Sequence, residues 1–285
     1  MKNNPPILPE ITMLNCGSAT HNADWNYQNI QSPFARIHTV TKGEAHILIG
    51  TERYKLSPGF IYLTPPFTLH TYECKGILEL NYMHIYENPL SKHSIFDEYN
   101  MPVAIAANEL DLSLVNRILG LNPYSKLTEY DPKYYDTEAI LQQNIERRSQ
   151  TDMYTRLTTR SLLVYLMAQF IKHASPKLKI MDERVKKIID YVRQNIDNPI
   201  SLNNLCQASA LSPNHVIRIF KSNMGITPID YINKKRIEKA QLMLLTENMS
   251  IKEIAYHLSF ENVSYFNRQF KHFTGTTPKK YRGGN

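Results

Sequence analysis

The sequence predicts an α+β fold, with a β-rich N-terminal half followed by an all-helical C-terminal domain. Three observations support this. Residues 34–86 contain short runs of β-branched and aromatic residues between turns, the last third repeats one helical pattern, and the excess positive charge lies in that repeat. A chain of 285 residues is long enough for two domains, which we expect at 1–173 and 182–285, joined by a linker at 174–181.

Four short strands are predicted in the N-terminal half. They cover Phe34–Val40, Ala45–Ile49, Arg53–Leu56 and Phe60–Leu63. The turns between them contain Lys42-Gly43, Gly50-Thr51 and Ser57-Pro58-Gly59. Strands of this length, separated by turns at this spacing, are typical of a small β-barrel or sandwich.

A long helix is predicted over Met153–His173, within a mainly helical region at residues 87–175. Its apolar stripe consists of Leu157, Ser161, Val164, Ala168 and Ile171, with Leu162, Leu166 and Phe170 beside it. A stripe this broad either packs on the N-terminal sheet or pairs with a second copy of the chain, and the pattern leaves both open. Pro176 and the lysines around it then predict a solvated linker.

A further helix is predicted from Asp182, and the chain then repeats one pattern at residues 201–231 and 250–281. Leu202 and Leu205 match Ile251 and Ile254 at an offset of 49 residues. At an offset of 50, Arg218, Phe220, Lys221, Gly225, Thr227, Pro228 and Tyr231 match Arg268, Phe270, Lys271, Gly275, Thr277, Pro278 and Tyr281. One extra residue therefore lies between Ser259 and Phe266, and one structural unit is used twice.

Each copy is predicted to form a helix, a tight turn and a second helix, the helix-turn-helix arrangement. Ser201, Ser212-Pro213 and Ser250 are typical of helix starts, and Gly225 and Gly275 suit helix ends. Between the copies, residues 228–245 fit one linking helix whose inward positions are Ile232, Ile237, Ala240, Leu244 and Leu245.

The second helix of each copy has a polar outer face. Its outer positions are Asn214, Ile217, Arg218 and Lys221 in the first copy, and Ser264, Asn267, Arg268 and Lys271 in the second. Arg and Asn can bond two atoms of one base edge, whereas Lys suits a phosphate. An ordinary solvated helix face is the alternative, but two matched basic copies argue against it. We therefore predict that these eight residues contact DNA, and that the two copies read different bases.

The C-terminal segment resembles the DNA-binding domain of the AraC/XylS family of transcription regulators, over about Asp182 to Arg282. The resemblance is most specific at Ile251, Glu253-Ile254-Ala255, Phe260, Ser264-Tyr265-Phe266, Arg268, Phe270-Lys271, Gly275, Thr277-Pro278 and Tyr281-Arg282. The family usually has glycine where this chain has Ala210 and Ser259, so slightly strained turns are expected. The resemblance implies two recognition helices in successive major grooves of double-stranded DNA, about 34 Å apart, with RNA polymerase as a further partner.

The charge distribution agrees with a DNA-binding C-terminal domain. Residues 181–285 contain 16 Lys/Arg and 9 Asp/Glu, whereas residues 1–180 contain 17 of each. The whole formal net charge of +7 therefore belongs to the repeat-containing part, as expected for a phosphate-binding surface. Met1–Glu10 lacks a signal-peptide pattern and no apolar run approaches 18 residues, which predicts a cytoplasmic protein without a membrane partner.

The N-terminal half resembles the cupin-like effector domain that precedes many AraC-type DNA-binding domains. The residues that carry this are Gly43, Tyr54-Lys55-Leu56-Ser57-Pro58-Gly59, Pro65-Pro66 and His70-Thr71-Tyr72. The resemblance implies a homodimer and a barrel that binds a small-molecule effector such as a sugar. The ligand-binding positions it implies are Trp25, Lys42, His70, Tyr72, Asn81 and Met83. For each of them a packing or solvated role is the alternative.

Neither a metal site nor catalysis is predicted. His38, His46, His70 and His84 form no His-x-His pair, and the motifs of serine hydrolases, phosphate-binding loops and zinc proteases are absent, so no enzyme activity and no cofactor is expected. Cys16, Cys74 and Cys206 form no Cys-x-x-Cys pair, and their odd number argues against a disulfide framework. Two alternatives remain: a metal-dependent cupin enzyme fused to a DNA-binding domain, and a ligand-independent regulator whose N-terminal domain only dimerises.

Overall fold

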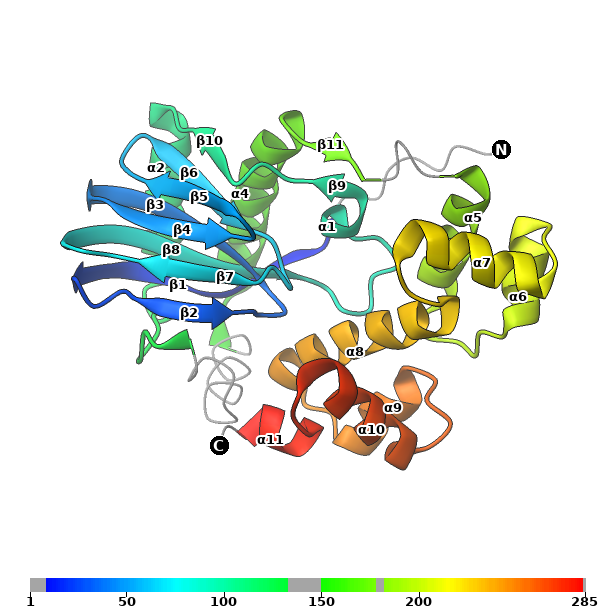
Figure 1. Cartoon of the computed structure of the whole chain (residues 1–285). Coiled ribbons are helices and arrows are strands. Elements are labelled where there is room, and N and C mark those ends of the chain that lie inside the picture. Colours follow the sequence, from blue (N-terminus) through cyan, green and yellow to red (C-terminus); the bar gives the residue numbers. More distant parts are fainter. Residues whose placement is uncertain (1–8, 133–149, 178–181, 284–285) are drawn as a thin grey trace. The chain divides into compact units, whose positions relative to one another are not determined.

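The computed structural model describes residues 9–132, 150–177 and 182–283, which form two units (Figure 1). The N-terminal unit comprises Met1–Asn88 and Ser94–Ser175, and the C-terminal unit comprises Pro89–His93 and Pro176–Asn285. The domain limits expected at 1–173 and 182–285 stay predictions. Residues 178–181 of the predicted linker lie outside the described residues.

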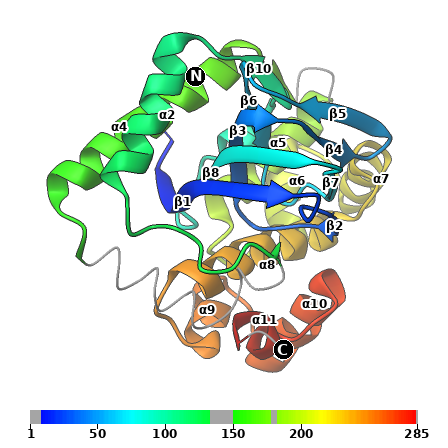
Figure 2. The same cartoon turned by 90° about the vertical axis from the view of Figure 1, so that its left-hand side faces the viewer.

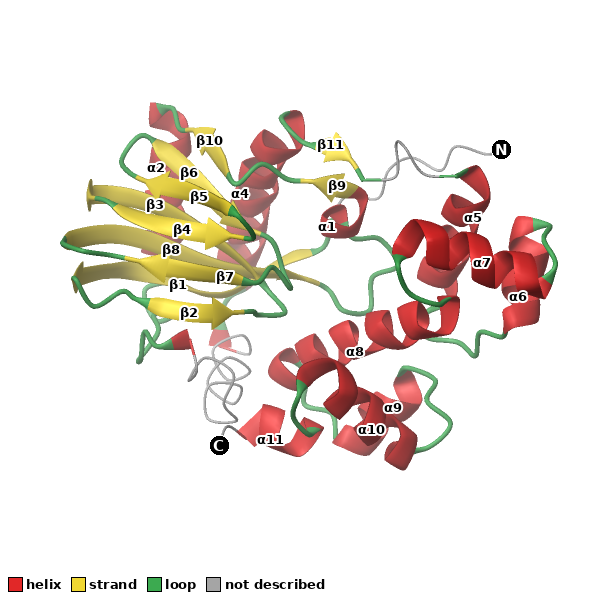
Figure 3. Ribbon diagram, in the orientation of Figure 1, coloured by secondary structure: helices red, strands yellow, loops and turns green. Residues whose placement is uncertain are grey.

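Two antiparallel sheets form the N-terminal unit (Figure 3). The five-stranded sheet has the order β1-β8-β3-β6-β10, and the four-stranded sheet has the order β2-β7-β4-β5. Their strands are β1 (Ile11–Asn22), β2 (Tyr27–Ile30), β3 (Ala35–Gly43), β4 (Ala45–Ile49), β5 (Glu52–Leu56), β6 (Phe60–Thr64), β7 (His70–Glu73), β8 (Ile77–Glu87) and β10 (Ala104–Ala106). Two short strands, β9 (Tyr99–Asn100) and β11 (Ser175–Pro176), pair with each other outside these sheets.

The α+β fold class and the four predicted strands are confirmed. Apart from the paired short strands β9 and β11, the described strands form two separate sheets, so the predicted barrel is an open sandwich. The sequence pattern does not predict β1, because Asn15, Gly17 and Ser18 have little intrinsic preference for a strand. Pairing with β8 along its length stabilises β1, from Ile11 opposite Glu87 to Asn22 opposite Ile77.

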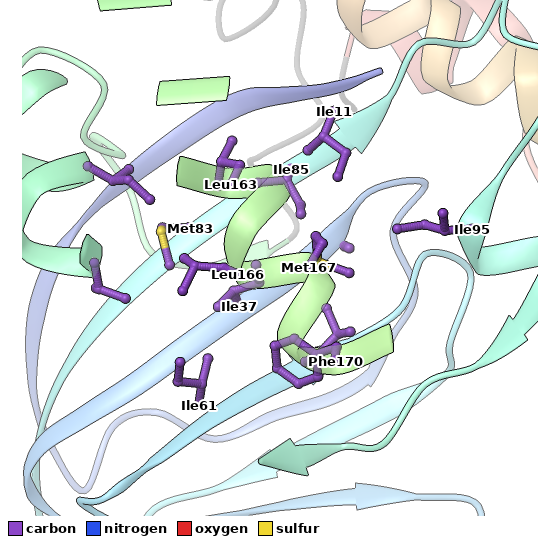
Figure 4. Close-up of a cluster of buried hydrophobic side chains, with 14 of the residues drawn as sticks. Ile11, Ile37, Ile61, Met83, Ile85, Ile95, Leu163, Leu166, Met167 and Phe170 are labelled. Atoms are coloured by element: carbon purple, nitrogen blue, oxygen red, sulfur yellow. The ribbon is translucent and has the colours of Figure 1, made fainter. Parts of the chain in front are cut away.

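A helical layer covers one face of the five-stranded sheet. It contains α1 (Ile95–Glu98), α2 (Glu109–Leu121) and α4 (Met153–Lys172). Figure 2 shows α2 and α4 on the opposite side of this sheet from β4 and β5. The core between sheet and helices includes Ile37, Ile61, Met83, Ile85, Leu163, Leu166, Met167 and Phe170 (Figure 4). Each of these residues is 0% exposed. This layer leaves the other face of the sheet to the four-stranded sheet.

The side of α4 that packs on the sheet overlaps only part of the predicted stripe. Leu157, Ser161 and Ala168 are exposed and Val164 and Ile171 are half-buried. The buried row contains Leu163, Leu166, Met167 and Phe170, of which Leu166 and Phe170 were predicted beside the stripe. Val164 and Ile171 of the stripe pack against the same core. The helix is apolar on most of its circumference, so its periodicity does not select one face. Pairing of α4 with a second copy stays a prediction.

Helices form the C-terminal unit. They are α5 (Glu183–Asn195), α6 (Leu202–Ser209), α7 (Pro213–Met224), α8 (Pro228–Thr246), α9 (Ile251–His257), α10 (Val263–Thr274) and α11 (Pro278–Gly283). Ser201 and Ser250 form capping boxes with Asn204 and Glu253. Ser212 occupies the cap position of α7 but makes no side-chain cap bond, so only its predicted place is confirmed.

Each helix-turn-helix motif has its own hydrophobic core. The core of the first motif joins α5, α6 and α7 through residues that include Ile188, Val192, Leu205, Val216 and Phe220. The core of the second joins α8, α9 and α10 through residues that include Ile237, Leu244, Ile254, Phe266 and Phe270. The linking helix predicted at 228–245 is α8, and all five of its predicted inward residues are buried.

The turns of the two motifs differ in length. Ala210 and Ser259 both have left-handed backbone, with φ of 55° and 54°, which agrees with the glycine preference of the family at these positions. Ser212 caps α7 two residues after Ala210, whereas Asn262 caps α10 three residues after Ser259. The extra residue of the second copy therefore lies between Ser259 and Asn262.

Candidate DNA interface and candidate ligand cavity

The predicted recognition helix of the first motif is α7. Val216 and Phe220 point into the core, and each is 0% exposed. Asn214, Ile217, Arg218 and Lys221 are all exposed on the other side. Gly225 ends the helix in the left-handed conformation, with its backbone N–H donating to the carbonyl of Lys221. The fold therefore presents the four predicted DNA-binding residues together on one helix face.

The second motif presents the matching face on α10. Ser264, Asn267, Arg268 and Lys271 are exposed, while Phe266 and Phe270 are buried in the core. The DNA-binding roles of these eight residues stay predictions.

Arg268 has a supporting contact that the sequence pattern does not reveal. Its guanidinium carbon lies 5.2 Å from the centroid of the Tyr265 ring, a cation–π distance. Asn233 of α8 donates to the hydroxyl of Tyr265 at 3.0 Å, and Asn233 is itself buried. The linking helix thus holds the ring on which Arg268 lies, which restricts the orientation of the guanidinium.

A cavity of about 20 Å³ lies between the two sheets of the N-terminal unit. Aromatic and basic side chains line most of it, and the full lining is Ala19, His21, Trp25, Arg36, His38, Tyr72, Leu80, Tyr82, His84, Leu127, Tyr130 and Pro132. Trp25 stacks on Tyr72, with ring centroids 3.9 Å apart. This volume suits about one water molecule, so a larger ligand requires side chains such as Trp25 to move.

Two of the six predicted ligand-binding residues, Trp25 and Tyr72, line this cavity. Met83 does not, because side chains alternate along β8 and Met83 points into the core under α4, whereas Tyr82 and His84 face the cavity. Asn81 is also outside the lining, and its side chain accepts a hydrogen bond from Ser18 Oγ at 2.7 Å.

The other two predicted positions also lie outside the lining. Lys42 is exposed and pairs with Glu79, its neighbour across the sheet, at 3.4 Å. His70 is buried, and its Nδ1 hydrogen-bonds with the carbonyl of Thr68 at 2.8 Å while its ring packs edge-on against Tyr72. Ligand binding by these six residues stays a prediction.

The sequence reasoning missed most of the polar lining. Arg36 is 2% exposed, donates from Nη2 to Ser32 Oγ at 2.8 Å and lies 4.9 Å from the Phe34 ring centroid. His38 lies two residues further along β3 on the same side. The alternation of Arg36, Ile37 and His38 could have predicted that Arg36 and His38 face the cavity, because alternate residues of a strand point to opposite faces and Ile37 points to the core.

Residues Leu127–Pro132 close one side of the cavity. The backbone N–H of Leu127 donates to the Tyr82 hydroxyl at 2.8 Å. Tyr130 packs edge-on against His21 and Tyr82, at centroid distances of 5.5 and 6.1 Å. This segment comes from the region after α2, so periodicity alone gives no reason to place it beside β8.

The buried histidines are held neutral. Burial and the neighbouring Arg36 charge lower the pKa of His38 to about 3 and that of His70 to about 4, and they lower the pKa of His84 well below its usual range. Among the described residues, no group of three or more His, Cys, Asp or Glu side chains could hold a metal ion. Burial also raises the pKa of the Cys16 thiol to about 12, which keeps it protonated and unreactive at neutral pH.

The histidine pKa values predict an acid-sensitive N-terminal unit. Between pH 6.5 and about 3 the unfolded chain binds a proton at His38 that the folded unit does not, so the free energy of unfolding falls as the pH falls through that window. Burial raises the pKa of Glu87 to about 7, which acts in the opposite direction between pH 4.5 and 7. The stabilising effect of this one carboxyl in acid is smaller than the combined destabilising effect of His38, His70 and His84, so a net loss of stability in acid is expected.

Urea unfolding followed by the fluorescence of Trp25, the single tryptophan, measures this at pH 7, 6 and 5. The variant His38→Gln should reduce the slope of the free energy of unfolding against pH by about 1.4 kcal/mol per pH unit, the contribution of one proton. An identical pH dependence in the two proteins would contradict the prediction.

Two family descriptions match the chain. "AraC-like ligand binding domain" matches residues 15–100, which include most of the two sheets, and "Helix-turn-helix domain" matches residues 205–284, which include α7 and α10. The chain belongs to the AraC family of transcription regulators. The resemblance found in the sequence is thereby confirmed for both halves. In this AraC-family chain nine of the twelve cavity-lining residues lie in the first matched region, and both candidate recognition helices lie in the second.

Two relatives that this AraC-family chain matches carry the names of transcription regulators. An uncharacterized HTH-type transcriptional regulator of Staphylococcus aureus (strain COL) is 31% identical over 134 residues, and the match covers 45% of this chain but only 18% of that protein. The lactose operon transcription activator of Staphylococcus xylosus is 22% identical over 282 residues, covering 93% of this chain and 90% of that protein. The crystal structure of ToxT from Vibrio cholerae O395 is 14% identical, covers 95% of this chain and 96% of that one, and has a TM-score of 0.49.

In the part of the chain that the structure describes, no helix is both long enough and apolar enough to span a membrane.

Proposed function

We propose that the protein is a transcription regulator that binds double-stranded DNA through α7 and α10. The observation that carries this proposal is the matched exposure of Arg218 and Lys221 on α7 and of Arg268 and Lys271 on α10, each above a buried phenylalanine. Both helices bear residues that suit base edges and phosphates. Because the outer residues differ between the motifs, one subunit reads two different sub-sites.

Selection from a library of random 40-base-pair duplexes tests DNA binding by the full chain. We expect enrichment of a site with two unlike sub-sites about one helical turn apart, about 10 base pairs from centre to centre. Affinity for the enriched duplex should exceed that for a scrambled duplex by at least about 1,000-fold. Failure to enrich any sequence would contradict the proposal.

Lys271 is assigned to a phosphate. Replacing it with alanine should lower the slope of log affinity against log salt concentration by about 0.9, the value for one phosphate contact in duplex DNA. Affinities measured between 50 and 200 mM salt supply the slope. Lys75→Ala, which removes an exposed lysine from the N-terminal unit, is the control and should leave the slope unchanged. A wild-type slope for Lys271→Ala would reject the phosphate contact.

The N-terminal unit is proposed to bind a small-molecule effector, with a sugar as the preferred class. Two observations support this: the cavity is lined by aromatic rings and a few polar groups, and a relative that aligns over 93% of this chain is named a lactose operon transcription activator. The effector has to bind one arrangement of the chain more tightly than the other in order to change DNA occupancy. A homodimer and contact with RNA polymerase stay parts of the proposal.

The small cavity favours a second candidate, in which the N-terminal unit takes no ligand and only mediates association. A cavity of about 20 Å³ is too small for a sugar unless Trp25 leaves its stack on Tyr72. Titration of mono- and disaccharides against Trp25 fluorescence separates the two. A saturable spectral shift with a rise in the unfolding midpoint supports effector binding. No response to any saccharide, in a protein that still binds DNA, supports the second candidate.

A further inference from the structure

Arg236 of α8 connects the two helix-turn-helix motifs at a buried junction. Its side chain is 7% exposed and donates to three backbone carbonyls. Nε donates to Ile196 at 3.0 Å and Nη2 donates to Asn198 at 2.6 Å, both directly after α5 in the first motif. Nη1 donates to Ser259 at 3.2 Å, in the turn of the second motif. One guanidinium therefore binds both motifs at once.

Ser259 adds a second connection at the same junction. Its hydroxyl donates to the backbone carbonyl of Asp197 at 2.6 Å. In this position Ser259 has a strained, left-handed backbone conformation, with a φ of 54°. Glycine would adopt that φ without strain, but it has no hydroxyl and so could not make the bond to Asp197. Ala210, the equivalent residue of the first motif, has the same backbone and no hydroxyl.

Directional contacts at this junction add to the apolar packing of the two hydrophobic cores in fixing the angle between the motifs. The two cores are separate clusters, one around Phe220 and one around Phe270, and α8 contributes Ile232 to the first and Ile237 to the second. Apolar packing is non-directional, whereas the planar guanidinium of Arg236 has donors in a rigid fork. Three carbonyls held by one fork, together with the Ser259 hydroxyl, therefore define a single arrangement of the segment after α5 relative to the second turn.

We propose that the junction of Asp197, Arg236 and Ser259 fixes the orientation of α7 relative to α10 and thereby sets the spacing of the two DNA sub-sites. The inference rests on the proposed DNA-binding function for its second part only. Asp197, Arg236 and Ser259 lie outside α7 and α10, so the junction acts by positioning these helices. It predicts specificity for spacing at a residue that contacts no base.

Ser259→Gly is the most discriminating variant. It relieves the left-handed strain while removing the hydroxyl, so the protein is expected to stay folded with little change in stability. Its preference for the selected duplex over duplexes with one base pair inserted or deleted between the sub-sites should fall about 2- to 10-fold, the effect of one lost hydrogen bond. Ala210→Gly is the matched control and should keep the full preference. An unchanged preference in Ser259→Gly would overturn the inference.

A distance measurement tests the junction without DNA. Ser222→Cys and His272→Cys place spin labels at equivalent exposed positions of α7 and α10, in a chain that carries Cys206→Ala, while Cys16 and Cys74 are buried. Double electron–electron resonance spectroscopy should give one narrow distance distribution. Ser259→Gly should broaden it, and Arg236→Lys should broaden it further, because one ammonium nitrogen cannot reach carbonyls that three separate guanidinium nitrogens bind. A distribution of unchanged width in both variants would overturn the inference. Broadening in a protein that selects no DNA site would uphold the junction and reject the proposed DNA binding.

Discussion

Replacing Phe270 with alanine is expected to lower the free energy of unfolding of the C-terminal unit by about 3–5 kcal/mol. Phe270 is 0% exposed and packs against Phe266 and Tyr281 at ring-centroid distances of 5.7 and 5.3 Å. Removing the ring leaves a cavity in a small core formed by α8, α9 and α10 with Tyr281 of α11, so little neighbouring structure can fill it. A domain of this size cannot lose that much stability without measurable unfolding.

The two units allow the effect to be assigned to one of them. Urea unfolding followed by circular dichroism at 222 nm reports mainly the helical C-terminal unit, whereas the fluorescence of Trp25 reports the N-terminal unit alone. Phe270→Ala should shift the first transition and leave the second in place. His272→Ala, at an exposed position on the same helix, is the control. A shift below about 0.5 kcal/mol, the usual range of surface substitutions, would show that Phe270 is not a core residue.

Replacing Arg268 with alanine is expected to weaken binding to the selected duplex by about 1–3 kcal/mol, and to weaken binding to scrambled DNA much less. Arg268 is exposed on α10, and its guanidinium lies over the Tyr265 ring at 5.2 Å. Tyr265 is itself held by Asn233. A guanidinium restricted in this way loses less conformational entropy when it binds two atoms of one base.

Arg268→Lys is the informative companion of Arg268→Ala. It keeps the charge but replaces the planar fork with a single ammonium, so it should restore binding to scrambled DNA while most of the specificity stays lost. Competition binding with the selected and scrambled duplexes, at one fixed salt concentration, measures both affinities. Equal losses on both duplexes for Arg268→Ala would mean that Arg268 contacts only phosphate.

Local sequence signals were sufficient to predict the helices of the C-terminal unit and their buried faces. The start of α9 follows from Ser250 and Glu253, the end of α10 from Gly275, and the inner face of each recognition helix from residues three and four positions apart. Caps and periodicity act within one or two turns of chain, so a single sequence reveals them. The cavity residues could not be found in this way. Met83 and Tyr82 are adjacent apolar residues of one buried strand, and only the packing of α4 decides which of them faces the core.

The sequence by itself determined that one helical unit is used twice, that both copies carry Arg and Lys on the outer face, and that the positive charge belongs to that part of the chain. Each of these depends on residue identity and short spacing. Only the tertiary structure decided that Arg36 and His38 line the cavity, which face of α4 is buried, and that Arg236 joins Ile196, Asn198 and Ser259. The hydrogen bonds of Arg236 join residues that are 23 to 40 positions apart in the sequence. The burial that makes such hydrogen bonds strong exists only after the chain has folded.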